Sequence, residues 1–332
     1  DPSQLNDEHQ RSLSITHPLI DNIIQQQSSM EGISGRMRVL KATARTAAGK
    51  KEKDHVVTLM AQLEPDLQRT LQLASEKGAS SWLTCRPLRR HGFTLHKGAF
   101  RDAICLRYGW DPDRLPATCA CGKPFSTTHA MSCAIGGYPS LRHNEVRDLT
   151  AALLRDVAHD VHVEPHLQPV TGERFPLRST ITAEQARLDV VVSGLHGGRF
   201  ERTFLDVRVF NPFAPSNRKP TIAGSYRKHE EEKRRSYESR ILNVEHASFI
   251  PVVFSTTGGQ GKAASTLFGR IAGIKSEKNG EPFSVAMALI RAQLSFALVK
   301  AAVACLRGHR HKSSRYDPHA YSATLAVSEC HL

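Results

Sequence analysis

Two apolar stretches of the chain, residues 187–192 and 204–209, each contain one acidic residue. Asp189 lies within Arg-Leu-Asp-Val-Val-Val, and Asp206 lies within Phe-Leu-Asp-Val-Arg-Val. The β-branched and aromatic residues predict two strands, and the Gly-Leu-His-Gly-Gly turn at 194–198 predicts that they pair as a hairpin. A carboxylate without a partner is costly to bury, so the pattern predicts two acids that share a cation. The alternative is a pair of edge-strand acids that point to solvent.

The order of predicted elements around these acids defines the fold class. A helix at 141–157 is followed by strands at 161–164, 187–192 and 203–209, a charged helix at 226–242 and a strand at 249–254. Because a helix separates the last two strands, they require a crossover connection. The sequence therefore predicts an α/β fold with a small mixed sheet flanked by helices, followed by helices at 261–274 and 283–307.

We divide the 332 residues into five segments. Residues 1–34 are a polar linker or arm, 35–117 a helical basic segment, 118–140 a Cys/His module, 141–258 the α/β core, and 259–332 C-terminal helices with a basic tail. Within the second segment, residues 57–73 have helical spacing interrupted by Pro65, which predicts two short helices meeting there. The chain starts at Asp1 without an apolar leader, and we expect it to be part of a larger polypeptide.

The net charge of +13 favours a polyanionic partner, with nucleic acid as the first candidate. Arg38, Lys41 and Arg45 share one face of a predicted helix and could follow a phosphate backbone; the alternative is a solvated helix surface. A membrane partner is not expected. The most apolar run, 283–306, is interrupted by Arg291 and Lys300, and only residues 292–299 are uncharged.

Three of the seven cysteines cluster between positions 119 and 133. Together with His129, they form the pattern C-x-C-x7-H-x3-C, in which Cys119, Cys121, His129 and Cys133 are ligand types of a closed tetrahedral zinc site. One helical turn separates the last two, so both side chains share a face. The pattern predicts a structural zinc knuckle; the alternative is unrelated thiols and a histidine. The odd cysteine count and irregular spacing fit a reducing compartment.

A phosphodiester-cleaving site needs a divalent cation, and Mg²⁺ prefers carboxylate oxygens such as those of Asp189 and Asp206. A lysine two positions after the second acid would complete such a site, but Arg208 stands there and can only clamp a phosphate. The following helix offers Lys233 and Tyr237, one turn apart on one face. The alternative for this lysine is a surface ion pair with the glutamate three positions before it.

Taken together, these motifs resemble the C-terminal region of non-LTR retrotransposon reverse-transcriptase polyproteins, which carry a CCHC knuckle and a restriction-like endonuclease of the PD-(D/E)XK superfamily. The resemblance covers roughly residues 80–255 and rests on the order of the motifs. These are the knuckle, then Arg142-His143-Asn144, Asp189, Asp206, and Lys233 followed by Tyr237. Two positions depart from the superfamily pattern: Leu188 replaces its proline and Arg208 its lysine.

The resemblance implies a Mg²⁺-dependent DNA endonuclease that nicks its target in the nucleus to prime reverse transcription. Asp189 and Asp206 would hold Mg²⁺, Lys233 would serve the water or the phosphate, and Tyr237, Arg142 and His143 would contact the substrate or brace the site. The implied partners are target DNA, an upstream reverse-transcriptase domain and the element's RNA. Two alternatives stay open: an inactive nucleic-acid-binding module of a decayed element, and a host resolvase or repair nuclease. No Tyr-x-Asp-Asp polymerase motif occurs.

Overall fold

The computed structural model describes residues 46–47, 49–52, 54–196 and 198–308. The chain divides into two compact units, residues 1–68 and 69–332, which we describe separately. The predicted basic stripe of Arg38, Lys41 and Arg45 lies outside the described residues. In the first unit, residues 54–61 are helical and the helix ends before Pro65, where α3 (Pro65–Ala74) begins. The predicted interruption at this proline is confirmed.

The second unit is built on a mixed four-stranded sheet of order β1-β2-β3-β4. The strands are β1 (Val161–Val163), β2 (Val190–Ser193), β3 (Arg202–Phe210) and β4 (Ser248–Ser255). The first three are antiparallel neighbours, whereas β3 and β4 run parallel and are joined through α9 (Ile222–Asn243). The predicted α/β class, hairpin and crossover are therefore confirmed.

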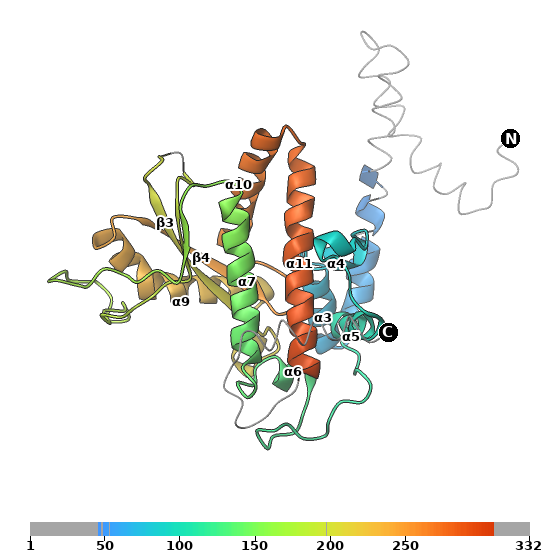
Figure 1. The fold of residues 1–332 in the computed structure, drawn as a ribbon. Helices are drawn as coiled ribbons and strands as arrows, with labels where there is room; N and C mark the ends of the chain where they lie inside the picture. The colour runs from blue at the N-terminus through green and yellow to red at the C-terminus, as the bar shows by residue number, and fades with distance from the viewer. Residues whose placement is uncertain (1–45, 48, 53, 197, 309–332) are drawn as a thin grey trace, which may run out of the picture. The chain divides into compact units, whose positions relative to one another are not determined.

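Alternating side chains of the strands divide between two hydrophobic cores. Leu205 and Val207 of β3 face the larger core, which packs against α7 (Tyr138–Arg155), α10 (Lys262–Asn279) and α11 (Phe283–Arg307). Phe204 faces the opposite side, where Ile241 of α9 covers the sheet. Figure 1 shows α7 and α11 side by side, with the sheet and α9 beside them. Asp206 has the same strand parity as Phe204, so it lies on the α9 side.

Smaller elements precede α7 and connect β3 to α9. They are α4 (Ser81–Thr84), η2 (Arg89–His91), α5 (Lys97–Tyr108), α6 (Thr127–Ala130) and α8 (Pro215–Arg218). Trp82 of α4 and Phe93 pack with Phe296 of α11 in a separate hydrophobic cluster. The described residues from 118 to 308 all lie in the second unit.

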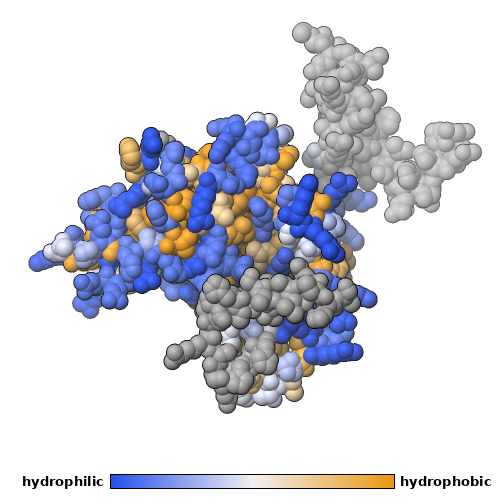
Figure 2. Space-filling view, in the orientation of Figure 1, coloured by the Kyte–Doolittle hydropathy of each residue, from blue (hydrophilic) through white to orange (hydrophobic). Residues whose placement is uncertain are grey.

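Helix α11 is long and apolar enough to cross a membrane by length and composition, so its two charges do not exclude a span as the sequence argument assumed. In the structure, 61% of its apolar window is buried inside the protein. Ile290, Leu294 and Leu298 belong to the larger core. In Figure 2, hydrophilic residues are interspersed with the hydrophobic ones on the visible face. The apolar character of α11 is explained by its place in the core.

Candidate metal cluster and acidic site

A tight hairpin presents the first two cysteines of the metal cluster. Thr118 and Pro124 form an antiparallel bridge, and the Gly122 amide donates to the Cys119 carbonyl over 2.8 Å. Gly122 has φ +85°, a conformation that L side chains rarely adopt, so glycine permits this turn directly after Cys121. The hairpin therefore directs both thiols toward the same side.

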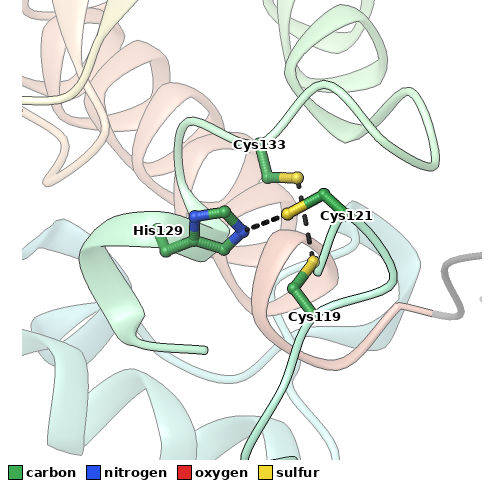
Figure 3. Close-up of side chains that lie close together, drawn as sticks. All are labelled: Cys119, Cys121, His129 and Cys133. Atoms are coloured by element: carbon green, nitrogen blue, oxygen red, sulfur yellow. Dashed lines mark hydrogen bonds between the residues drawn. The ribbon is translucent and has the colours of Figure 1, made fainter. Parts of the chain in front are cut away.

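Helix α6 presents His129, and the turn that follows the helix presents Cys133. The Ser126 hydroxyl caps the helix by accepting from the His129 amide, and the Cys133 amide donates to the His129 carbonyl over 2.9 Å. These two residues are thus one helical turn apart, as predicted. Figure 3 shows all four side chains converging, and their ligand atoms lie within 4.8 Å of one another.

The spacing of these four ligand atoms fits a tetrahedral ion. The sulfurs of Cys119 and Cys133 are 3.8 Å apart, and the Cys121 sulfur is 3.3 Å from His129 Nε2. Zinc–sulfur bonds of about 2.3 Å at tetrahedral angles place two sulfurs about 3.8 Å apart. All three thiols are free, since none forms a disulfide. The cluster could therefore hold a metal ion such as zinc, and it is the one group of three or more such ligands in the described chain.

The two predicted acids lie close together, but only the second is inside a strand. The register of β2 with β3 ends at Val190 and Leu205; the Asp189 amide donates to the Leu205 carbonyl over 3.2 Å, and its carboxylate accepts from the Val207 amide, so Asp189 lies beside Asp206. Asp206 lies within β3, as predicted. Asp189, however, is not inside a strand: it lies at a bend directly before β2. Residues 187 and 188 contact His166 and Pro165, just after β1, through one bridge and one hydrogen bond. They do not form a continuous ladder, and the segment bends before β2 begins.

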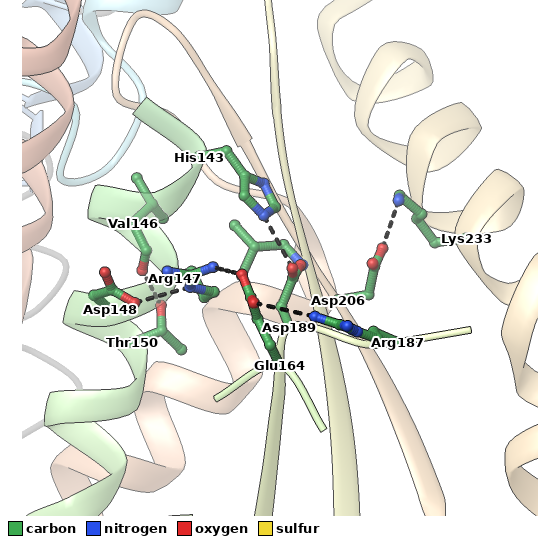
Figure 4. Close-up of polar contacts among 11 residues, drawn as sticks. His143, Val146, Arg147, Asp148, Thr150, Glu164, Arg187, Asp189, Asp206 and Lys233 are labelled. Atoms are coloured by element: carbon green, nitrogen blue, oxygen red, sulfur yellow. Dashed lines mark hydrogen bonds and ion pairs between the residues drawn. The ribbon is translucent and has the colours of Figure 1, made fainter. Parts of the chain in front are cut away.

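Asp189 is held from one side by α7. His143 Nε2 lies 2.9 Å from its Oδ1, and the Val207 amide donates to its Oδ2 over 2.5 Å. Its side chain is 14% exposed. Figure 4 shows His143 reaching from α7 toward this carboxylate. His143 therefore braces the first acid.

Asp206 is held from the other side by α9. Lys233 Nζ lies 2.7 Å from its Oδ2, and the two side chains are 19% and 8% exposed (Figure 4). Burial raises the pKa of the Asp206 carboxyl, the Lys233 ammonium opposes that rise, and the nearby Asp189 adds to it. The alternative pairing of Lys233 with Glu230 does not occur, because Glu230 accepts from the Ala263 amide at the start of α10.

Tyr237 lies one turn beyond Lys233, whose ammonium is 5.8 Å from the centre of its ring. Burial raises the pKa of Tyr237 to about 12, and Asp206 and Asp189 contribute to that rise. The phenol is therefore neutral at physiological pH and retains a proton that it can donate. The two acids, the lysine and the tyrosine meet in one site, as the sequence predicted.

Arg208 lies on the same face of β3 as Asp206, two positions further along, and it is half-buried. Its charge acts on the buried His229 of α9, whose pKa is lowered by burial and then by the Arg208 charge. His229 Nε2 lies 3.2 Å from the Asn217 side-chain oxygen. Arg208 is therefore beside the acidic site, with a guanidinium that could bind a phosphate.

Arg142 does not face the site. It is 4% exposed, and its guanidinium donates to the Met131 carbonyl over 3.1 Å and to the Cys305 sulfur over 3.4 Å. Of the two roles expected for it, substrate contact and bracing, this burial supports bracing only. An arginine on an amphipathic helix is exposed by default, so sequence alone gave no sign of these partners.

Two further groups near the site were missed. Glu164, at the end of β1, is bound through its carboxylate by Arg147 and, at 3.9 Å, by Arg187; its amide donates to the Asp189 carbonyl over 2.9 Å. Glu164 has a positive φ of 53°, a backbone conformation that no sequence pattern predicted. Asn211, directly after β3, has an almost fully buried side chain, and the sequence patterns did not single it out.

No protein-family model matches the chain, and a search of curated proteins finds no match either. The chemical meaning of the site therefore rests on the geometry of its own residues and on the motif order of the sequence.

Proposed function

We propose that the chain is a divalent-metal-dependent endonuclease that hydrolyses phosphodiester bonds of DNA. One observation carries the proposal: the Asp189 carboxylate accepts from the amide of Val207, the residue after Asp206, and an ammonium from α9 lies 2.7 Å from the Asp206 carboxylate. Two acids and a lysine in this arrangement have the donor types that metal-assisted phosphodiester cleavage requires.

Two carboxylates fit the requirements of Mg²⁺, which is held in many phosphate-processing sites by one or two carboxylates together with substrate phosphate and water. Burial of Asp206 beside Asp189 supports this fit: desolvation raises the pKa of Asp206 and the Asp189 charge adds to that rise, so a bound cation would favour the ionised carboxylate. A cation bound here would polarise the phosphate and lower the pKa of an attacking water.

The residues of the chain have distinct roles in this proposal. Lys233 orients the attacking water or binds a phosphate oxygen, since an ammonium paired with a carboxylate is a hydrogen-bond donor and a poor base. Tyr237 donates a hydrogen bond to a phosphate oxygen, and Arg208 clamps the phosphate. His143 positions Asp189. The basic net charge of +13 supplies the long-range attraction for DNA.

We further propose that the cluster of Cys119, Cys121, His129 and Cys133 is a structural zinc site. Four protein ligands complete a tetrahedral shell and leave no open position for substrate. The biological setting implied by the motif order is DNA nicking in the nucleus that primes reverse transcription by an upstream domain.

Nicking of supercoiled plasmid in Mg²⁺ tests the catalytic proposal. We expect the wild-type protein to produce open circles, Asp206→Asn to reduce the rate at least 100-fold, and the exposed α9 control Glu231→Gln to retain it. Equal nicking by wild type and Asp206→Asn would end the assignment.

A DNA-binding measurement on the same proteins distinguishes the endonuclease from the main alternative, a module that binds DNA without cutting it. The Lys233–Asp206 pair neutralises the buried acid without any cation, as in a module that binds DNA and does not cut it. Such a module would bind plasmid and show no Mg²⁺-dependent nicking in any variant. Retained DNA binding by Asp206→Asn, together with lost nicking, supports the endonuclease.

A further inference from the structure

The metal cluster and the acidic site are connected through a buried asparagine. Asn211 directly follows β3, the strand that carries Asp206, and it is 6% exposed. Its side-chain amide donates to the Thr128 carbonyl over 3.0 Å and to the Ser132 hydroxyl over 2.9 Å. Both acceptors are sequence neighbours of metal-cluster residues, one before His129 and one before Cys133. The asparagine thus joins the end of β3 to the segment holding half of the cluster.

The orientation of this amide is fixed by its other contacts. Its side-chain oxygen accepts from the Phe213 amide over 3.0 Å, and the Asn217 side chain donates to its backbone carbonyl over 2.9 Å. With the oxygen engaged in the turn after β3, only the two N–H groups face the cluster segment. Both must find acceptors, because a buried unpaired donor costs about 1–3 kcal/mol.

A second connection runs to the other acid. Arg142 donates to the Met131 carbonyl, between His129 and Cys133, and the next residue, His143, contacts Asp189. The segment 128–132 is therefore bonded both to the end of β3 and to the turn of α7 that braces Asp189. Each connection is made by a buried side chain with a defined donor geometry.

We propose that Asn211 is a positioning residue through which metal binding at the cluster orders the C-terminal end of β3, the strand that carries Asp206. The inference rests on the proposal that the cluster binds zinc. Metal fixes the relative positions of His129 and Cys133, this fixes the Thr128 and Ser132 acceptors, and these acceptors hold Asn211 and the end of β3. By thermodynamic reciprocity, weakening the Asn211 bonds lowers metal affinity, although the asparagine is not a ligand.

Hydrogen exchange with and without a zinc chelator tests this connection on the full chain and needs no nuclease activity. In the wild type, we expect chelation to accelerate exchange in peptides covering residues 202–211 and 138–146. In Asn211→Asp, which keeps the oxygen that accepts from Phe213 but loses both donors, we expect the 202–211 response to disappear and the 138–146 response to remain.

Metal affinity, measured by competition with a chromophoric chelator, gives the reciprocal readout. We expect Asn211→Asp to bind zinc about fivefold or more weakly than wild type, and Ser132→Ala, which removes one acceptor, to show a smaller loss. Asn279→Asp makes the same chemical change at an exposed position of α10 and should leave affinity unchanged. If Asn211→Asp fails to fold, hydrogen exchange and zinc affinity are both measured on Ser132→Ala instead.

Two results would overturn the proposal: an unchanged 202–211 exchange on chelation of the wild type, or wild-type coupling and affinity in both Asn211→Asp and Ser132→Ala. Neither result bears on the endonuclease proposal, which the nicking assay decides separately. Conversely, a chain that binds zinc and shows the coupling but never nicks DNA would leave this inference standing.

Discussion

Replacing Lys233 by methionine should destabilise the protein, because it leaves the Asp206 carboxylate buried without its counter-charge. At 2.7 Å and an effective dielectric constant of about 20, the gross attraction of the pair is roughly 6 kcal/mol. Desolvation costs several kcal/mol per buried ion, so the net contribution of the intact pair is small. Removing the Lys233 ammonium removes the attraction but leaves most of the desolvation cost of the buried Asp206 carboxylate. We expect Lys233→Met to lower the free energy of unfolding by about 2–4 kcal/mol.

Urea unfolding followed by circular dichroism, at pH 7 with chelator, measures this effect within a double-mutant cycle. Asp206→Asn relieves the uncompensated charge, so the double variant should be more stable than the sum of the single losses predicts, by about 1–3 kcal/mol. Arg234→Met is the matched control on the same helix, because its ion pair with Glu238 is solvent-exposed and should contribute less than about 1 kcal/mol. If the losses of the two single variants sum to the loss of the double variant within about 0.5 kcal/mol, the reasoning is refuted.

Three further predictions concern other parts of the second unit. Cys133→Ser should reduce bound zinc from about one equivalent to none, measured by elemental analysis of the purified protein; one retained equivalent would contradict the cluster. Burial raises the pKa of Glu76 to about 7, above its unfolded value near 4.3, so unfolding free energy should fall as pH rises from about 4.3 through 7. Glu76→Gln should flatten that decline and add about 1–3 kcal/mol at pH 8, less than the full shift because the carboxyl keeps some solvent contact; parallel pH curves would contradict it. Arg240→Lys should lose about 2–4 kcal/mol in urea unfolding, because the fully buried guanidinium donates to three carbonyls of the 165–188 segment that a lysine cannot reach together; a loss below 1 kcal/mol would show that the segment rearranges.

Local periodicity was sufficient to predict the sheet. Strands β2 and β3 combine β-branched and aromatic residues with a glycine turn, and these signals act over fewer than ten residues each. The proximity of Asp189 to Asp206 followed from the hairpin alone, since antiparallel register brings residues of the two segments together once the turn is known. The bend at Asp189 was not predictable, because it depends on contacts with β1 and β3 that are distant in sequence.

The counter-charges of the acids could be predicted only in part. Lys233 was expected at the site from the order of the motifs, whereas its spacing alone favoured a surface ion pair with Glu230. The bond from His143 to Asp189 spans 46 positions, and that from Asn211 to Ser132 spans 79, with no periodic signal joining either pair. Such contacts depend on how helices and loops pack. The local sequence around a polar loop residue does not indicate which distant residue it will contact.

The arrangement of these counter-charges bears on how the acidic site persists without a cation. Asp189 is held by His143 from α7, and Asp206 by Lys233 from α9, so helices on opposite sides of the sheet support the two neighbouring carboxylates. Two unpaired carboxylates at neighbouring positions would repel each other and destabilise the sheet. Separate partners remove that cost and keep each acid oriented. A cation bound between them would find both carboxylates already positioned. It would also balance the Asp206 charge, so that the Lys233 ammonium could bind a phosphate oxygen. The same ion pair that stabilises the resting fold therefore supplies the ammonium that the proposed reaction requires.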